Sequence, residues 1–375
     1  MKRALPYAVF AFFVASFALN AQSPLFTHRL ADPDDYMRLN EVANWMRGQS
    51  WYDLSMPRLS PGAHTVVHWA RLLDLPIALA ALPFIKSYGL VNALLTASFF
   101  VPLAYFALLL WLLSALSAPV AGDDNAPLSV PLVLFAPILL FNYTPGRVDH
   151  HGVQALIAGF GLLSLSNIIL EKNGASFAIL AALGFACGFW IGAEALLWAI
   201  IFIACLAVAA AWQGGKVARA AALFGIALSA FTTLLIPIAL PAAQFSSRAL
   251  SWFSPAYIVF AALSGMIFVL GLAARNASRG WRLALYAALG LGAAAAFFTL
   301  IPSAVQGPFA NYDAFDATTM LASIGEAIPL SHAFHVNRFM PATFIPAAIT
   351  FFRLLFLPLA ALIAALFAAR KASSA

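Results

Sequence analysis

Long apolar runs recur from one end of the chain to the other, and short polar segments separate them. A helix needs about 20 apolar residues to cross a hydrocarbon core of about 30 Å. The runs predict spans at about 4–22, 89–117, 128–142, 152–170, 175–191, 195–212, 220–240, 256–274, 283–303 and 343–369. We therefore expect an all-α, polytopic integral membrane protein of about ten transmembrane helices, folded as one domain over residues 1–375.

Two segments between the runs are long, at about 23–88 and about 304–342, whereas the other loops are tight. Several short loops carry Lys or Arg and fall on the same side as Lys2 and Arg3. The positive-inside rule assigns that side to the cytoplasm. Both long segments then become outer loops on the periplasmic or extracellular face of a plasma (inner) membrane. The first run also has the form of a signal peptide, and either interpretation puts the next segment outside.

The composition agrees with a membrane protein, because 63% of the residues are hydrophobic and 9% are charged. Globular domains carry roughly a quarter charged residues. Both cysteines, Cys187 and Cys205, lie inside apolar runs, so neither a disulfide framework nor a thiolate metal site is indicated. The net charge of +6 comes without a basic run interleaved with aromatic residues, so we expect no nucleic-acid partner.

Titratable side chains are unequally shared between the two faces. The loop assignment puts all seven histidines on the outer side, together with eleven of the fourteen acidic residues. These acids are Asp32, Asp34, Asp35, Glu41, Asp53, Asp74, Asp149, Glu194, Asp313, Asp316 and Glu326. Groups capable of chemistry are therefore concentrated on one face, where we expect the function to lie.

The first outer loop begins with an amphipathic pattern. Apolar residues recur at helical spacing over 36–46, which predicts a helix along the membrane surface. Asp32 followed by Pro33 is typical of a helix cap and first turn. Asp34 and Asp35 then have two interpretations. They are either first-turn carboxylates favoured by the helix dipole, or catalytic and metal-binding groups.

Later in the same loop, the stretch SPGAHTVVHWARLLDLP combines histidines with an arginine. His68 and Arg71 suit an anionic headgroup or a phosphate at the membrane surface. Trp69 is equally consistent with an interfacial anchor, because aromatic residues gather at membrane boundaries.

The polar stretch YTPGRVDHHGVQ, at 143–154, lies between two apolar runs. Asp149 and His151 stand two residues apart at the start of a span, and they can face one ion only if the backbone there is still irregular, which the preceding Pro–Gly pair allows. Carboxylate and imidazole ligands suit Mg²⁺, Mn²⁺ or Zn²⁺, according to the remaining ligands. The alternative is a capping Asp beside interfacial histidines, although charged groups at the bilayer edge are costly for a mere cap.

The last outer loop reads FANYDAFDATTMLASIGEAIPLSHAFHVNRF. Glu326 and Arg338 are the candidates here, although Asp313 and Asp316 are equally eligible acids. Carboxylates from the first and last loops, together with the turn at 149–151, can supply a hard divalent cation with oxygen and imidazole ligands. Such an ion would neutralise phosphate charge and stabilise a leaving group.

These residues resemble motifs of the GT-C class of integral-membrane glycosyltransferases, and specifically of the catalytic subunit of oligosaccharyltransferase in its archaeal and bacterial forms. Asp34-Asp35-Tyr36 is similar to an Asp-x-aromatic motif in the family's first outer loop. Asp149-His150-His151 is similar to the Asp-x-His motif that follows the third span, and Ser323-Ile324-Gly325-Glu326 approximates a Thr-Ile-x-Glu motif. The resemblance spans about residues 1–340.

The resemblance implies a metal-dependent transfer of a sugar or oligosaccharide from a polyprenyl-(pyro)phosphate donor, with Mg²⁺ or Mn²⁺ as cofactor. The implied metal ligands are Asp34, Asp149, His151 and Glu326. Asp34 is preferred to Asp35 because it carries the Asp-x-Tyr spacing, and His150 is left as a bystander. The expected catalytic residues are Asp34, Asp35 and Glu326. We expect the donor phosphate to meet Arg338, His68, Arg71 and Arg147, and Ser323 to orient the acceptor.

The sequence departs from the family's pattern in two ways. Ser323 stands where the family has Thr, and the chain ends after about ten spans, without the family's C-terminal soluble domain and its Trp-Trp-Asp motif. The acceptor therefore stays open between a protein, a lipid and a glycan, and a partner subunit is an open alternative.

Two other functions use the same outer loops. A lipid-linked glycan transporter or flippase would hold a headgroup there, but charges inside the spans are nearly absent apart from Arg353. A membrane metallohydrolase would keep the metal site and replace the acceptor with water.

Overall fold

The computed structural model of the protein describes residues 2–20, 23–27, 29–30, 32–56, 66–67 and 69–306. Helices form nearly all of the regular structure in this part of the chain, which confirms the predicted all-α fold. The elements are η1 (Lys2–Ala4), α1 (Leu5–Ala18), α2 (Pro24–Thr27), α3 (Pro33–Met46), α4 (Arg71–Ala121), η2 (Ala126–Phe135), α5 (Pro137–Phe141), α6 (His151–Ile169), α7 (Gly174–Ile191), α8 (Glu194–Gln213), α9 (Gly215–Ala239), η3 (Ala242–Gln244), α10 (Ala256–Gly271), η4 (Leu272–Ala274), α11 (Arg279–Leu300) and η5 (Pro302–Gln306).

Within the described residues, seven helices are long and apolar enough to cross a membrane. They are α4, α6, α7, α8, α9, α10 with η4, and α11. Two other predicted spans correspond to shorter elements, the 14-residue α1 and the 3₁₀ helix η2. The predicted last span, 343–369, lies outside the described residues.

The predicted span at 128–142 is divided rather than continuous, since η2 is followed by the short helix α5. Pro131 lies inside η2, and Pro137 is the first residue of α5. Proline lacks a backbone N–H and its ring clashes with the carbonyl four residues earlier, so it interrupts an α-helix. The prolines explain why this apolar run does not form one span.

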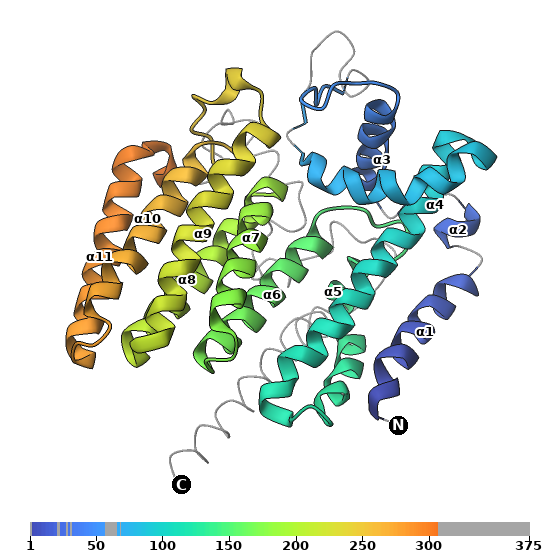
Figure 1. Ribbon diagram of the computed structural model, residues 1–375. Coiled ribbons are helices and arrows are strands. Elements are labelled where there is room, and N and C mark those ends of the chain that lie inside the picture. The colour runs from blue at the N-terminus through green and yellow to red at the C-terminus, as the bar shows by residue number, and fades with distance from the viewer. Residues whose placement is uncertain are drawn as a thin grey trace, which may run out of the picture.

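Helix α4 covers 51 residues and bends at Gly89, where φ is 73°. Glycine adopts this left-handed conformation without the penalty that a Cβ would bring. The sequence predicted an outer loop up to about residue 88 and a span from about residue 89, and the bend lies at that boundary. In Figure 1 the first arm of α4 runs across the upper part of the molecule, and the second arm descends beside α1.

Helices α7, α9 and α10 pack closely around a core of small and aromatic residues. A Cβ added to Gly225 on α9 would lie 2.6 Å from the Cα of Gly265 on α10. Lipid tails are as apolar as the helices, so packing between spans depends on such close approach of small residues.

Successive helices from α6 to α11 alternate in direction, so their connections gather at two opposite ends (Figure 1). One end, which we call the basic end, holds the connections 170–173, 213–214 and 275–278, with Lys172 and Arg275. Arg282 in α11 ties the end of α8 to the connection 275–278, because it donates hydrogen bonds to the carbonyls of Ala211 and Ala277, at 2.7 and 2.5 Å. The other end, the acidic end, holds α3, the turn at 142–150 and the first turn of α8.

Candidate functional site

The N-terminus of α3 is fixed by a capping box. Asp32 Oδ1 accepts hydrogen bonds from the backbone N–H groups of Asp34 and Asp35, at 2.9 and 3.4 Å. Asp35 Oδ2 in turn accepts a 3.1 Å bond from the backbone N–H of Asp32. Reciprocal bonds of this kind satisfy N–H groups that a helix start otherwise leaves open. The predicted helix and its Asp32–Pro33 start are confirmed.

A buried ionic network holds α3 against the first arm of α4. Arg38 Nη1 lies 3.2 Å from carboxylate oxygens of both Glu41 and Asp74. Arg71 Nη1 lies 3.0 Å from Asp74 Oδ2 and 3.6 Å from Glu41 Oε1. Arg71 also donates to the backbone carbonyl of Asp53 at 2.6 Å. Each guanidinium thus faces both carboxyl groups, and such pairing offsets part of the cost of burying charge.

The turn before α6 is shaped by backbone contacts. Gly146 has a φ of 88° and donates a 2.9 Å hydrogen bond to the carbonyl of Ser98 on α4. The Tyr143 hydroxyl, which is fully buried, donates a 2.8 Å bond to the carbonyl of Gly152 in α6. These contacts fix the path of the backbone through residues 147–151. They explain why the Pro–Gly pair and Tyr143 precede the titratable residues of this turn.

The start of α3 meets this turn through two contacts of Asp35. Asp35 Oδ1 accepts a 2.7 Å hydrogen bond from the backbone N–H of Val148, and Asp35 Oδ2 lies 3.3 Å from Arg147 Nη1. Arg147 also forms ion pairs with Asp32 and, at 3.1 Å, with Asp149. One guanidinium therefore bridges three carboxylates from two segments that lie far apart in the sequence.

The histidines of the turn contact both Asp149 and α8. His150 Nδ1 lies 2.5 Å from Asp149 Oδ1, and its Nε2 lies 3.5 Å from Glu194 Oε1. His151 Nε2 lies 3.4 Å from Asp149 Oδ2. Gln154, one turn into α6, donates a 3.0 Å hydrogen bond to Glu194. We call the following residues the carboxylate–histidine cluster: Asp32, Asp35, Arg147, Asp149, His150, His151 and Glu194.

Burial and neighbouring charge shift the pKa values in this cluster. Burial raises the pKa of Asp35 to about 7, and the charge of Asp149 adds to that rise against the hydrogen bond from Val148. Burial also pushes the pKa of Asp149 up, but His150 outweighs it and holds that pKa below its usual range. Burial alone would lower the pKa of His150, whereas Asp149 and Glu194 raise it to about 9.

The cluster has the donor atoms and the charge that a divalent cation needs. One ligand atom each from Asp149, His150 and His151 lies within 4.8 Å of the other two. The four carboxylates of the cluster are faced by one guanidinium and two imidazoles, so negative charge is in excess. Carboxylate oxygens and neutral imidazoles bind ions such as Mn²⁺ and Zn²⁺, and carboxylates also bind Mg²⁺. The residues present therefore fit a divalent metal ion.

The structure brings together some of the predicted site residues and separates others. Asp149 and His151 lie in the cluster, and so does Asp35, which is completely buried. Asp34 is exposed beside it. Arg147 and Arg71 are 4% and 2% exposed, and both are engaged with protein carboxylates. Four predicted residues lie outside the described part of the chain: His68, Ser323, Glu326 and Arg338.

The sequence interpretation did not assign three residues of the cluster. His150 was taken as a bystander, but it links Asp149 to Glu194. Glu194 was noted as an outer acid without a role, and Asp32 only as a cap. The signal for Glu194 was its position, since an acid at the first turn of a span, after Gly192, is unusual in an apolar segment.

Comparison with known proteins gives a match in structure alone. No protein-family model and no curated protein sequence matches the chain. A solved structure of archaeal oligosaccharyltransferase AglB from Archaeoglobus fulgidus superposes with a TM-score of 0.62 over 90% of this chain, at 16% sequence identity. The fold resembles the transmembrane part of archaeal oligosaccharyltransferase. This chain spans 40% of that AglB chain.

A second structure of the Archaeoglobus fulgidus oligosaccharyltransferase superposes over 96% of this chain and 51% of its own, with a TM-score of 0.59 and 16% identity. The first AglB structure holds an inhibitory peptide and a dolichol-phosphate, and the second holds Zn and sulfate. The predicted resemblance to an oligosaccharyltransferase catalytic subunit is thus confirmed for the fold.

Proposed function

We propose that the protein is a metal-dependent membrane glycosyltransferase. It transfers a sugar or oligosaccharide from a polyprenyl-(pyro)phosphate donor to a protein, lipid or glycan acceptor. The observation that carries the proposal is that Asp35 bonds to the turn that holds Asp149 and His151, at one end of an oligosaccharyltransferase-like fold. The acidic end lies opposite the Lys- and Arg-bearing connections, so the positive-inside rule assigns it to the periplasmic or extracellular face.

Asp35, Asp149 and His151 hold the metal ion in this proposal, with Mg²⁺ or Mn²⁺ as the expected ion. When bound, the ion neutralises the donor phosphate and stabilises the charge that develops on the leaving group. Glu326 and Asp34 remain proposed contributors, as ligand or as the group that activates the acceptor. His150 orients Asp149, because its two ring nitrogens contact Asp149 and Glu194.

The donor phosphate also needs positive charge from the protein, since transition-state charge is best stabilised by preorganised groups. Arg147 lies beside Asp35 and Asp149, and it would be suited to this role if a bound ion compensated the charge of those carboxylates. Arg338 and His68 remain proposals for the same role, and Ser323 for orienting the acceptor. We assign Arg71 to the support of α3, because its guanidinium is occupied by Asp74 and the carbonyl of Asp53.

The test is transfer of a labelled sugar from a polyprenyl-linked donor by the full chain in lipid nanodiscs, with Mn²⁺ or with a chelator. We expect sugar transfer to occur with Mn²⁺ and to stop in chelator. The transfer rate of Asp149→Asn should be lower by about 100-fold or more, as when a main electrostatic stabiliser is removed. Asp123→Asn is the matched control, because Asp123 is an exposed acid remote from the acidic end.

The products separate this function from the alternatives. Free sugar in place of transferred sugar would indicate a metallohydrolase. Movement of intact donor across the bilayer, independent of divalent ions, would indicate a transporter. An undiminished transfer rate in Asp149→Asn would contradict the assignment of Asp149 as a metal ligand.

A further inference from the structure

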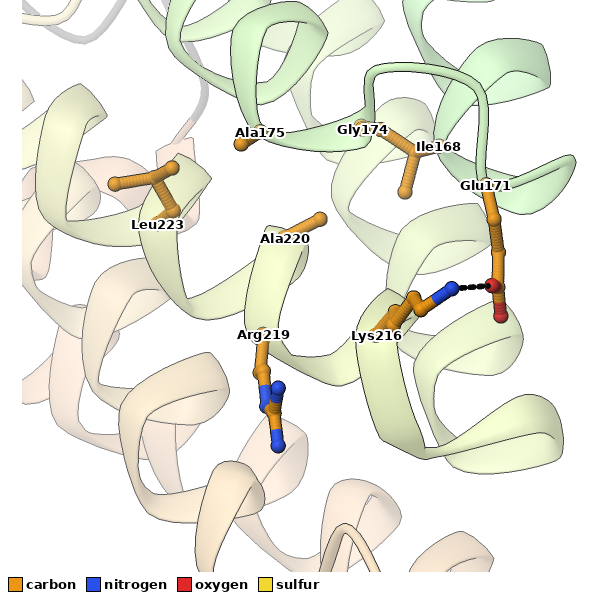
Figure 2. Close-up of a pocket in the computed structure, with 8 residues that line it drawn as sticks. All are labelled: Ile168, Glu171, Gly174, Ala175, Lys216, Arg219, Ala220 and Leu223. Atoms are coloured by element: carbon orange, nitrogen blue, oxygen red, sulfur yellow. Dashed lines mark ion pairs between the residues drawn. The ribbon is translucent and has the colours of Figure 1, made fainter.

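A cavity of about 270 Å³ lies at the basic end, remote from the carboxylate–histidine cluster. It is bounded by the end of α6, the start of α7 and the first turns of α9 (Figure 2). The residues that matter for its chemistry are Ile168, Glu171, Lys216, Arg219, Ala220 and Leu223.

The floor of the cavity is apolar and its rim is charged. Among the lining residues, Ile168 and Ala220 are buried and Leu223 is half-buried, and we call these three apolar residues the floor. At the rim, Lys216 Nζ pairs with Glu171 Oε2 at 3.1 Å, and these side chains are 77% and 42% exposed. Figure 2 shows Lys216 reaching towards Glu171, while the side chain of Arg219, three residues further along α9, extends away from that pair. A solvent-exposed pair of this kind is weak, so Lys216 is available to a competing anion.

The position of the cavity fixes its surroundings in the bilayer. Helices α6, α7 and α9 are each long and apolar enough to span the membrane, and the cavity lies at their ends, which places it at headgroup depth. The first turns of α7 and α9 both meet there, and helix N-termini favour negative charge. Two exposed cations, Lys216 and Arg219, therefore border an apolar pocket at the level where lipid phosphates lie.

We propose that this cavity binds one anionic phospholipid from the membrane. The lipid phosphate pairs with Lys216 and Arg219, and the proximal acyl carbons cover Ile168 and Leu223. Basic pockets between spans recognise anionic headgroups through this combination of charge and shape. The apolar floor favours a lipid over a free phosphate ion, which has nothing to bury there. The inference rests on the basic end alone and does not depend on the proposed glycosyl transfer.

The test is native mass spectrometry of the full chain, solubilised in detergent and mixed with phosphatidylglycerol or phosphatidylcholine. We expect one phosphatidylglycerol to be retained in preference to phosphatidylcholine, and excess inorganic phosphate to leave it in place. The double variant Lys216→Gln/Arg219→Gln should weaken phosphatidylglycerol binding about tenfold or more, since each cation near a lipid surface contributes about 1 kcal/mol.

The matched control is Lys172→Gln/Arg279→Gln, which removes the same charge from the basic end without changing the cavity lining. Glu171→Gln removes the competing anion and should tighten binding. All these side chains are exposed, so thermal midpoints in phosphatidylcholine should agree with the unmodified protein. Equal loss in both double variants, equal retention of the two lipids, or displacement by inorganic phosphate would each overturn the proposal.

Discussion

Asp35 Oδ1 accepts a 2.7 Å hydrogen bond from the backbone N–H of Val148, which lies 113 residues later in the chain. The bond fastens the start of α3 to the turn before α6. Val148 is itself buried in the apolar cluster that joins α3 to the first arm of α4. The acids of the first loop therefore meet Asp149 as parts of one packed unit.

Replacing Asp35 should impair the metal site more than replacing Asp34. In Asp35→Asn the amide oxygen still accepts from Val148, but the buried charge is lost. We expect Mn²⁺ affinity, measured by isothermal titration, to fall at least about tenfold. Asp34→Asn changes an exposed carboxylate and should cause a smaller loss. If Asp34→Asn gave the larger loss, Asp34 would be the ligand, as its spacing before Tyr36 suggests.

Replacing Arg147 should make the fold depend on a divalent ion. Arg147→Gln leaves Asp32, Asp35 and Asp149 close together without their shared guanidinium. Removing one partner of a buried ion pair costs about 3–5 kcal/mol. We expect a lower thermal midpoint in chelator and a larger rise on adding Mn²⁺ than the unmodified protein shows. An equal Mn²⁺-induced rise in both proteins would argue that Arg147 lies away from the ion.

Gly192 leaves the space in which His150, Gln154 and Glu194 meet. A Cβ added there would lie 2.5 Å from Glu194 Oε2 and 2.6 Å from Gln154 Nε2. Gly192→Ala should displace Glu194 from His150 and lower the rate of sugar transfer while the protein remains folded. Gly184→Ala on α7 is the control, because its Cβ would meet no described atom within 4 Å. Unchanged transfer by Gly192→Ala would remove Glu194 from the proposed site.

The network below α3 predicts a pH dependence of stability. Burial, with the charge of Asp74, raises the pKa of Glu41 above its usual value, against the attraction of Arg38 and Arg71. The folded state then holds this proton more tightly than the unfolded state does. Stability must therefore fall as pH rises from the ordinary pKa of glutamate, near 4.5, towards the raised value.

The variant Glu41→Gln mimics the protonated side chain and tests this prediction. Its thermal midpoint should fall less steeply with rising pH than that of the unmodified protein. Near-equal midpoints of the two proteins at neutral pH would agree with a protonated Glu41. If Glu41 is ionised, Glu41→Gln leaves a buried charge unpaired. The free energy of unfolding of the variant would then be lower by about 3 kcal/mol or more.

The contact between Gly225 and Gly265 should limit the size of residue at either position. Gly225→Ala puts a Cβ 2.6 Å from backbone of α10, so α9 and α10 must separate. We expect a lower thermal midpoint in detergent. Gly290→Ala on α11 meets no described atom within 4 Å and should be neutral or slightly stabilising, because alanine favours a helix over glycine by about 1 kcal/mol. Equal effects of the two substitutions would contradict the close packing.

The sequence by itself determined the local features of this protein. Apolar runs specified most of the spans, and Asp32 and Pro33 specified the start of α3. These features depend on residues close together in the chain, through hydrogen-bond periodicity, capping and backbone sterics. The assignments of His68, Ser323, Glu326 and Arg338 stay predictions, since they lie outside the described residues.

Only the tertiary structure decided which polar groups meet. Asp34 and Asp35 are neighbours in sequence, yet only Asp35 is buried against Val148 and Arg147. The ion pair between Arg38 and Asp74 on the first arm of α4 fixes which face of α3 turns towards the turn at 142–150. Glu194 joins His150 because α8 starts where α6 starts, at the same end of the bundle. Such contacts depend on how whole helices pack, and helical spacing within one segment carries no information about the side chains that another segment presents.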